Sequence, residues 1–224
     1  MTGYSIFIDF DFTITTDDVG NRFFTFFSDG ENEPVVKRWL NREVSSYTCL
    51  TEEARLCRGD YDAFVDYVDR FEIDSGFERL IHYCNSHNLP MYILSDGLDF
   101  YIKHILNKYG FGNIPFFSNR AVFTGDGLEI KLPYYSEDCP ECGNCKGNRI
   151  RELKRPDDRV VYIGDGFSDI CGVREADLIF AKDDLAKHLK QNGNKFYEYD
   201  NLSQVVTGLE RIIGTDYREV KLRG

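Results

Sequence analysis

The sequence predicts an α/β protein with a doubly wound, parallel-sheet core and a small helical bundle inserted after the first strand. An apolar, β-branched run opens the chain at residues 5–10. About sixty residues with helical periodicity follow it. Strands and helices then alternate from Gly76 onward, which is typical of a parallel sheet covered by helices. We therefore assign residues 1–14 and 75–224 to the core and residues 15–74 to a helical cap.

The inserted segment contains four stretches with apolar residues at helical spacing. They are VGNRFFTFFSD from residue 19, EPVVKRWLNREVS from residue 33, TEEARLCR from residue 51 and YDAFVDYVDRF from residue 61. We expect the third helix to begin at Thr51, because Glu52 and Glu53 suit a first turn. A module inserted after a strand overhangs the carboxyl edge of a parallel sheet, where such folds bind ligands.

The rest of the chain supplies the remaining strands and helices of the core. We expect strands at residues 90–95, 114–119, 159–164, 177–181 and 195–199, and helices at residues 77–88, 98–110, 146–154, from about 168, 182–191 and 201–214. The segment AVFTGDGLEIKL has Asp126-Gly127 between two alternating arms. This pattern predicts a tight β-hairpin, which we place as an excursion from the sheet.

The composition limits the classes of partner that we expect and indicates the cellular compartment. The chain has 224 residues, of which 42% are hydrophobic, and its 38 acidic and 27 basic side chains give a net charge of −11. This charge argues against nucleic acid or an anionic membrane as a partner. The sequence shows neither a secretory signal pattern nor an uncharged stretch long enough to span a membrane, so we expect a cytoplasmic protein. The oligomeric state is left open.

Seven cysteines in a chain without a secretory signal indicate reduced thiols rather than a disulfide framework. Three of them, Cys139, Cys142 and Cys145, form the run CPECGNCK. A closed zinc site needs four ligands, and the run supplies three. Cys171, or a histidine brought near by folding, could complete the set. Zinc binding and plain loop thiols are both compatible with this run.

Polar side chains follow several predicted strands at the points where they end. Asp9 and Asp11 end the first strand, Ser95 ends the second, and Asp165 and Asp169 follow the strand at residues 159–164. The carboxyl ends of parallel strands meet at one edge of a sheet, so these residues are expected to converge. Their clustering indicates a functional site at that edge.

The two acids of the first strand need a cation, a proton or solvent. Alternation along a strand places Asp9, Asp11 and Thr13 on one face, and two ionised carboxylates so close repel each other. Carboxylates at positions 9, 11 and 165 form an all-oxygen pocket that suits Mg²⁺. Lys146 opens a helix directly after the cysteine run and is a candidate to offset the charge of an anionic substrate.

These motifs together resemble the haloacid dehalogenase superfamily of phosphohydrolases. The matching features are DFDFT after the first strand, a serine ending the next strand, a lysine opening a later helix, and G-D-x-x-x-D after a further strand, in that order. The helical insert, DFDFT and the loop CPECGNCKG resemble the phosphoserine phosphatase-like branch. That branch includes the methionine-salvage enolphosphatase and the phosphocholine/phosphoethanolamine phosphatases.

The resemblance implies a Mg²⁺-dependent phosphomonoester hydrolase that acts on a small phosphorylated metabolite. Asp9 would be the nucleophile that forms an aspartyl phosphate, Asp11 the general acid/base, and Ser95 and Lys146 the groups that hold the phosphoryl oxygens. The implied magnesium ligands are Asp9, Asp11 through its carbonyl group, and Asp165, with Asp169 in a supporting role. The implied substrate contacts are Phe10, Phe12, Thr13, Asp96, Gly97 and Arg22, with the backbone N–H groups near Phe10 and Gly97 facing the phosphoryl group.

Phe12 departs from the resemblance, since many relatives have glycine or a small residue there. It either packs away from the acids or lines the leaving-group pocket. The cap would select the substrate, and its polar candidates are Asp17, Asn21, Arg22, Arg42 and Arg55. The methionine-salvage enol phosphate (2-hydroxy-3-keto-5-methylthiopentenyl-1-phosphate) and phosphoserine are the first substrate candidates, followed by phosphocholine or phosphoethanolamine.

Three other functions compete with this hypothesis. A phospho-acceptor regulatory domain also uses an acidic Mg²⁺ pocket with serine and lysine, but its acids come in a different order. A zinc-dependent interaction module could be built on CPECGNCK. A catalytically idle relative is disfavoured because all four motif positions are filled.

Overall fold

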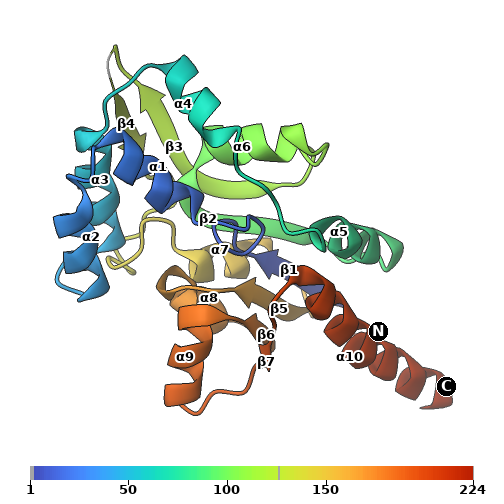
Figure 1. Cartoon of the computed structure of the whole chain (residues 1–224). Coiled ribbons are helices and arrows are strands. Elements are labelled where there is room, and N and C mark those ends of the chain that lie inside the picture. The colour runs from blue at the N-terminus through green and yellow to red at the C-terminus, as the bar shows by residue number, and fades with distance from the viewer. Residues whose placement is uncertain (1–2, 126, 224) are drawn as a thin grey trace.

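The computed structural model describes residues 3–125 and 127–223. Within them, seven strands form one sheet in the order β4-β3-β2-β1-β5-β6-β7, with β1 at its centre (Figure 1). The strands are β1 (Tyr4–Ile8), β2 (Met91–Leu98), β3 (Phe116–Phe123), β4 (Leu128–Lys131), β5 (Arg159–Gly164), β6 (Leu178–Ala181) and β7 (Tyr197–Glu198). Neighbouring strands are parallel except β3 and β4. The predicted α/β fold with a mostly parallel sheet is confirmed.

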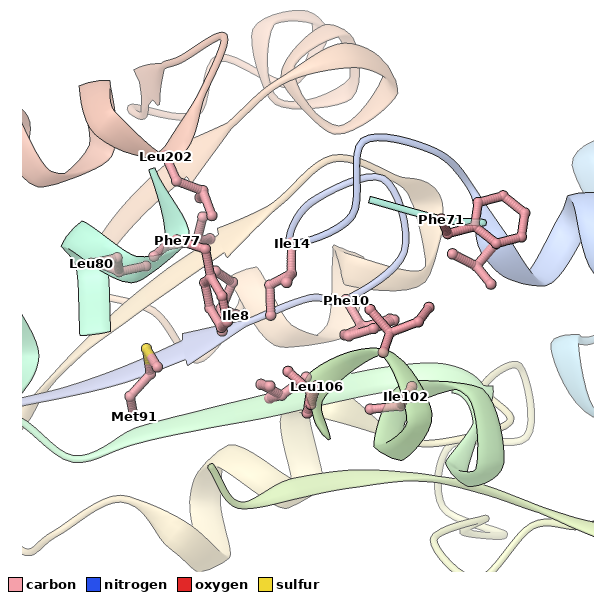
Figure 2. Packing of buried hydrophobic residues seen from close by; sticks show 14 of the residues in the cluster. Ile8, Phe10, Ile14, Phe71, Phe77, Leu80, Met91, Ile102, Leu106 and Leu202 are labelled. Atoms are coloured by element: carbon pink, nitrogen blue, oxygen red, sulfur yellow. The ribbon is translucent and has the colours of Figure 1, made fainter. Parts of the chain in front are cut away.

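Helices cover both faces of this sheet. One face carries α5 (Phe77–Ser86), α6 (Asp99–Lys108) and α10 (Leu202–Arg223), and the other carries α7 (Lys146–Leu153), α8 (Ile170–Val173) and α9 (Asp183–Gln191). Ile6 and Ile8 of β1 pack into the first layer, while Phe7 packs into the second. Figure 2 shows Ile8 beside Phe77 of the first layer. The central strand is apolar except for Ser5, whose hydroxyl donates to Asp158, because both faces of the strand are buried.

Four helices lie between β1 and α5 in the sequence. They are α1 (Val19–Phe27), α2 (Glu33–Leu40), α3 (Ser46–Leu56) and α4 (Tyr61–Val68). Figure 1 shows them gathered near β3 and β4. An aromatic cluster joins α1 and α4 to the core. The Phe23 ring of α1 lies 5.2 Å from Phe64 in α4 and 5.4 Å from Phe100 in α6, and Phe100 lies 5.3 Å from Phe123 in β3. The boundaries of the cap at residues 15–74 stay a prediction.

Two predicted elements differ from the structure. Helix α3 begins at Ser46 rather than Thr51, because the side chain of Ser45 caps it by accepting a hydrogen bond from the Thr48 backbone N–H. The predicted hairpin does not leave the sheet. β3 runs without a break from Phe116 to Phe123 and β4 pairs with it at the sheet edge, which buries Leu128. Asp126 of the predicted turn lies outside the described residues.

The strand ends at the functional edge also shift. β1 ends at Ile8, two residues before the predicted end, and β2 continues past Ser95 to Leu98 with a change of register after Leu94. Asp9 is held at the end of β1 because its backbone N–H donates to the Ile163 carbonyl of β5 at 2.9 Å. β1 pairs with β2 on one side and β5 on the other, so Asp9 lies where the strand order reverses. Such a switch point is the usual ligand site of an open α/β sheet.

Candidate active site

A tight turn follows β1 and shapes the first part of the site. The backbone N–H groups of Thr13, Ile14 and Thr15 all donate to the Phe10 carbonyl, at 3.3, 2.9 and 3.1 Å. Because the strand ends at Ile8, this turn and not strand alternation places Asp9 and Asp11 against the same cavity. The predicted shared strand face is therefore wrong for this segment, although its consequence, two neighbouring acids at one site, is present.

Lys146 occupies the centre of a buried charge network. Its Nζ atom lies 2.7 Å from Asp9 Oδ1, 2.6 Å from Asp169 Oδ1 and 3.1 Å from Ser168 Oγ. The side chain is fully buried. Burial alone lowers the pKa of a lysine, but the charges of Asp169 and Asp9 outweigh it and raise the pKa of Lys146. Lys146 is therefore a fixed cation beside Asp9.

Asp169 anchors this network. Its Oδ1 atom accepts hydrogen bonds from Lys146 and from the Tyr162 hydroxyl at 2.6 Å each, and its Oδ2 atom accepts from the backbone N–H groups of Asp165 and Gly166 at 2.9 and 3.0 Å. Each carboxylate oxygen of Asp169 thus accepts two hydrogen bonds. This arrangement fits the supporting role predicted for Asp169 better than direct binding of a metal.

The acids around Lys146 form a set of oxygen ligands that fits a divalent cation. One carboxylate oxygen each of Asp9, Asp165 and Asp169 lies within 4.8 Å of the others. Burial and the neighbouring acids raise the pKa of Asp9 well above its usual value and that of Asp165 to about 8. Three acids face one buried lysine, so the network has an excess of negative charge. Hard oxygen ligands with uncompensated negative charge suit Mg²⁺, with Asp9 and Asp165 as the less engaged ligands.

Asp11 has a different environment, built by hydrogen bonds from cap and core. It accepts from the Gly20 backbone N–H at 3.0 Å, the Ser95 hydroxyl at 3.2 Å and the Tyr101 hydroxyl at 3.0 Å. Burial, followed by the charge of Asp18, raises the pKa of Asp11 to about 7. A carboxyl group with a pKa near neutrality can both give and take a proton, as a general acid/base requires.

The end of β2 is braced against the cysteine loop. The Asp96 carboxylate accepts from the Asn144 backbone N–H at 2.7 Å, and the Asn144 side chain donates to the carbonyl groups of Ser95 and Phe117 at 3.0 and 2.9 Å. Burial raises the pKa of Asp96 to about 6. These contacts fix Ser95 beside Asp11 and Lys146 beside Asp9.

One cavity joins the acids to the cap. Asp9, Asp11 and Ser95 lie at its floor, which is formed by the strand ends. Its walls come from α1, α2, α3 and the segments beside them: Asp18, Gly20, Asn21, Phe24, Val36, Trp39, Ser46, Cys49, Leu50 and Glu53. Among the described residues that line this cavity there is no lysine or arginine. The walls are therefore largely apolar, with two acids.

Comparison with known proteins identifies the family. The family described as "Putative Phosphatase" matches residues 4–198. The chain belongs to this family. It is 30% identical to a Bacillus mycoides protein named 2-hydroxy-3-keto-5-methylthiopentenyl-1-phosphate phosphatase, over 97% of this chain and 98% of the relative. A Lysinibacillus sphaericus protein of the same name is 33% identical, over 83% of this chain and 85% of the relative.

Solved structures agree with this phosphatase fold. A structure described as "Phospho-Aspartyl Intermediate Analogue of Phosphoserine phosphatase" superposes with a TM-score of 0.71 at 19% identity, covering 92% of this chain and 99% of that one. The prediction of a phosphatase enzyme is thus confirmed. The fold is that of the predicted haloacid dehalogenase-type, phosphoserine phosphatase-like architecture. In the part of the chain that the structure describes, no helix is long and apolar enough to cross a membrane.

Some predicted substrate contacts of this phosphatase lie elsewhere. Arg22 pairs with Asp17 at 2.6 Å, and neither they nor Arg42 and Arg55 line the cavity in the described part of the chain. Arg22 is therefore not positioned to contact a substrate there. Asn21 does line the cavity.

The predicted contacts around the DFDFT turn differ in their surroundings. The Phe10 ring is fully buried in the core, and its backbone N–H donates to Asp9 Oδ1 at 2.8 Å. Thr13 donates to Asp165 Oδ1 at 2.6 Å, and so supports an acid. The Gly97 N–H donates to Ser95 Oγ at 2.8 Å. Both amides predicted to face the phosphoryl group therefore point at side chains of the site.

Phe12 fits neither of its two alternatives. Its ring is 38% exposed, so it is not core packing, and it is not among the described residues that line the cavity. Its backbone has φ of 57°, which the turn requires, and Lys182 Nζ lies 5.0 Å from the ring centroid. The residue serves the turn, and its ring interacts with a cation.

Several residues of the site escaped the sequence analysis. Tyr101 and Tyr162 lie in apolar stretches of α6 and β5, where the sequence pattern indicates core residues. Ser168 lies within the G-D-x-x-x-D motif, and Asn144 lies within CPECGNCKG. Their positions in these motifs could have identified both residues. Glu53 gave no signal of burial, since acids in helices are usually solvated.

Proposed function

We propose that this phosphatase is Mg²⁺-dependent and hydrolyses a small phosphorylated metabolite through an aspartyl phosphate on Asp9. One observation carries the proposal: the Asp9 carboxylate lies 2.7 Å from the buried Lys146 cation, in the cavity that also holds Asp11, whose pKa is about 7. A nucleophile, a fixed cation and a proton carrier thus share one site.

In the first step, Asp9 attacks phosphorus and the bond between phosphorus and the ester oxygen breaks. Asp11 gives its proton to that oxygen, so the alcohol leaves neutral. In this proposal Ser95 donates a hydrogen bond to a phosphoryl oxygen, and the positive charge of Lys146 stabilises the negative charge that these oxygens gather in the transition state.

In the second step, water attacks the phosphorus of the aspartyl phosphate and the bond to Asp9 breaks. Asp11, now ionised, takes a proton from the water, which restores the starting state and releases inorganic phosphate. Asp9 and Asp165 would hold Mg²⁺, which neutralises negative charge on the transferring phosphoryl group when it is bound. The structurally similar phosphoserine phosphatase, which was solved as a phospho-aspartyl intermediate analogue, supports this order of events.

The cavity walls favour some substrates over others. Phosphoserine carries a free carboxylate, which would face Asp18 and Glu53 without a cationic partner among the described lining residues. The apolar side chains of Phe24, Val36 and Trp39 suit a thioether tail. We therefore propose 2-hydroxy-3-keto-5-methylthiopentenyl-1-phosphate, the substrate in the names of the two relatives, as the substrate here.

A second substrate class is favoured by the two acids of the cap. Glu53 is buried and hydrogen-bonded to Asn32 at 2.9 Å, and burial raises its pKa to about 7. Together with Asp18 and the Trp39 ring, it could hold an ammonium group such as that of phosphocholine or phosphoethanolamine.

A panel of phosphomonoesters tests these proposals. Phosphate release would be measured for the enol phosphate, phosphoserine, phosphocholine and phosphoethanolamine, with Mg²⁺ and with EDTA. We expect turnover only with Mg²⁺ and the highest kcat/KM for the enol phosphate. Preference for phosphocholine would select the second class. Stable phosphorylation of the protein without turnover would indicate a phospho-acceptor domain and not an enzyme. Turnover that survives Asp9→Asn would refute the role of Asp9 as the nucleophile. The cytoplasmic location stays a prediction.

A further inference from the structure

Four cysteines from two segments meet beside the active site. Cys139, Cys142 and Cys145 lie in the loop before α7, and Cys171 lies in α8. Their sulfur atoms all lie within 4.8 Å of one another. Cys139 lies 3.4 Å from Cys142 and 3.6 Å from Cys171, and Cys142 lies 3.5 Å from Cys171. Folding thus brings Cys171, rather than a histidine, to the three cysteines of the run CPECGNCK.

These separations match one tetrahedral metal ion. A zinc–thiolate bond of about 2.3 Å places the sulfur atoms of a tetrahedral site roughly 3.8 Å apart. A disulfide needs about 2.05 Å between sulfurs, and all four thiols are free. An iron–sulfur cluster distributes its cysteines over several iron atoms, which holds the sulfurs of different irons farther apart than this group allows. The geometry is therefore that of a mononuclear site.

The chemistry of the site selects zinc. Four thiolates are soft ligands, which favour zinc over the magnesium that the carboxylates of the active site suit. The site is also closed. Cys142 and Cys145 are 9% and 2% exposed, whereas Cys139 and Cys171 are half-buried. Four protein sulfurs complete a tetrahedral shell, which leaves no open position for water or substrate. We propose that Cys139, Cys142, Cys145 and Cys171 bind one structural zinc ion.

The zinc site joins two helices that carry active-site residues. Cys145 directly precedes Lys146, the first residue of α7, and Cys171 lies two residues after Asp169. The helices touch at Gly147, where an added Cβ atom would lie 2.7 Å from the Cys171 carbonyl oxygen. A zinc ion shared by the loop and α8 clamps these segments together. It thereby holds Lys146 at 2.6 Å from Asp169 and 2.7 Å from Asp9.

Metal analysis of the full chain tests the binding. The protein would be purified without a histidine tag, with a thiol-free reductant, and its zinc content measured by mass spectrometry. We expect about one zinc per chain. Replacement of zinc by Co²⁺ should give thiolate-to-cobalt charge-transfer bands and the strong visible bands of a tetrahedral site. These two measurements need no variant and do not depend on the phosphatase reaction.

Two variants locate the zinc. Cys171→Ser removes the one ligand outside the loop and should lower the bound zinc well below that of the wild type. Cys84→Ser is the matched control, because Cys84 is a free thiol buried in α5, outside the cluster. It should keep the zinc content of the wild type. If Cys171→Ser does not fold, Cys139→Ser, which removes a partly exposed ligand of the cluster, is compared with Cys84→Ser in its place, and should lose zinc and the tetrahedral cobalt spectrum.

The positioning of Lys146 gives a separate kinetic result. We expect Cys171→Ser to lower kcat by about 10- to 100-fold with little change in KM, as the loss of a supporting contact does, because the cap that binds the substrate is untouched. Three results would overturn the proposal: a wild-type protein free of zinc that takes up no Co²⁺, a red protein that holds iron in place of zinc, or a Cys171→Ser variant with full zinc content.

Discussion

In the described part of the chain, two compact groups of side chains have the composition of metal sites, and they differ in chemistry and in access. The acidic group, Asp9, Asp165 and Asp169, has hard oxygen atoms and borders the substrate cavity through Asp9. The thiol group, made of the four cysteines at positions 139, 142, 145 and 171, has soft sulfur atoms and a closed shell. A catalytic metal needs an open position, whereas a structural metal needs none.

The acidic group also carries a net negative charge. The acidic group contains its own cation, since Lys146 lies between Asp9 and Asp169, and still keeps an excess of negative charge. Such an excess destabilises the fold unless a cation binds, so the site gives up stability for function. The thiol group lies beside it and can restore rigidity at the same two segments. Changes in the acidic group should therefore act mainly on the chemistry. Changes in the thiol group should act mainly on stability, with a smaller loss of kcat because Lys146 is displaced.

The largest effect is expected for Asp9→Asn. The amide cannot attack phosphorus, so kcat/KM should fall at least about 10³-fold. The melting temperature should stay or rise, because the variant removes a carboxylate from a group with excess negative charge. Phosphate release and thermal unfolding measure both effects. Asp17→Asn, which neutralises an acid on the cap surface, is the control and should leave both unchanged. A large loss of stability in Asp9→Asn would contradict the division between the groups.

A smaller loss is expected for Asp11→Asn. Loss of the proton carrier should lower kcat by about 10²- to 10⁴-fold for an alkyl phosphate. The loss should be much smaller for p-nitrophenyl phosphate, since its leaving group needs little protonation. The wild type should also lose activity toward alkyl phosphates as the pH rises through about 7, where Asp11 ionises in the free enzyme. Equal losses for both substrates would show that Asp11 does not protonate the leaving group.

Removal of the thiol group's metal should act mainly on stability. A structural zinc contributes its binding free energy to folding, so Cys142→Ser should lower the melting temperature by more than about 10 °C. A thermal unfolding scan with and without added zinc measures this. Cys57→Ser, a buried thiol outside both groups, is the control for loss of a buried sulfur. If the melting temperature of Cys57→Ser fell by the same amount, the stabilising role of the thiol group's metal would be contradicted.

The smallest effect is expected at Glu53, a buried acid outside both groups. Burial raises its pKa from 4.5 to about 7. Its protonated form therefore favours the fold below pH 4.5, and this contribution is lost as the pH rises to 7. Glu53→Gln removes that loss, so its melting temperature should exceed that of the wild type by about 7 °C at pH 8 and match it at pH 4. An equal difference at both pH values would show that Glu53 does not titrate in this range.

Much of the active site followed from local sequence because the motifs lie at strand ends. Asp9, Asp11, Ser95, Lys146 and Asp165 were all predicted, and the structure brings them to one edge of the sheet. Parallel strands share the direction of their carboxyl ends, so residues far apart in sequence can be placed together without knowing the contacts. The fold class followed from the same alternation of strands and helices.

Contacts between side chains needed the tertiary structure. Tyr101 and Tyr162 sit in apolar stretches, and only packing shows that their hydroxyl groups reach Asp11 and Asp169. Arg22 and Phe12 were predicted at the substrate, but an ion pair with Asp17 and the turn at φ of 57° place them elsewhere.

The sequence by itself determined the fold class, the acids at the strand ends and the three cysteines before Lys146, because strand periodicity and motif spacing are local properties of the chain. The tertiary structure alone decided the partner of each side chain. It placed Cys171 with the other three cysteines and gave the cavity an apolar wall with two acids. The physical reason is that a contact depends on the packing of segments distant in sequence, which no local pattern encodes.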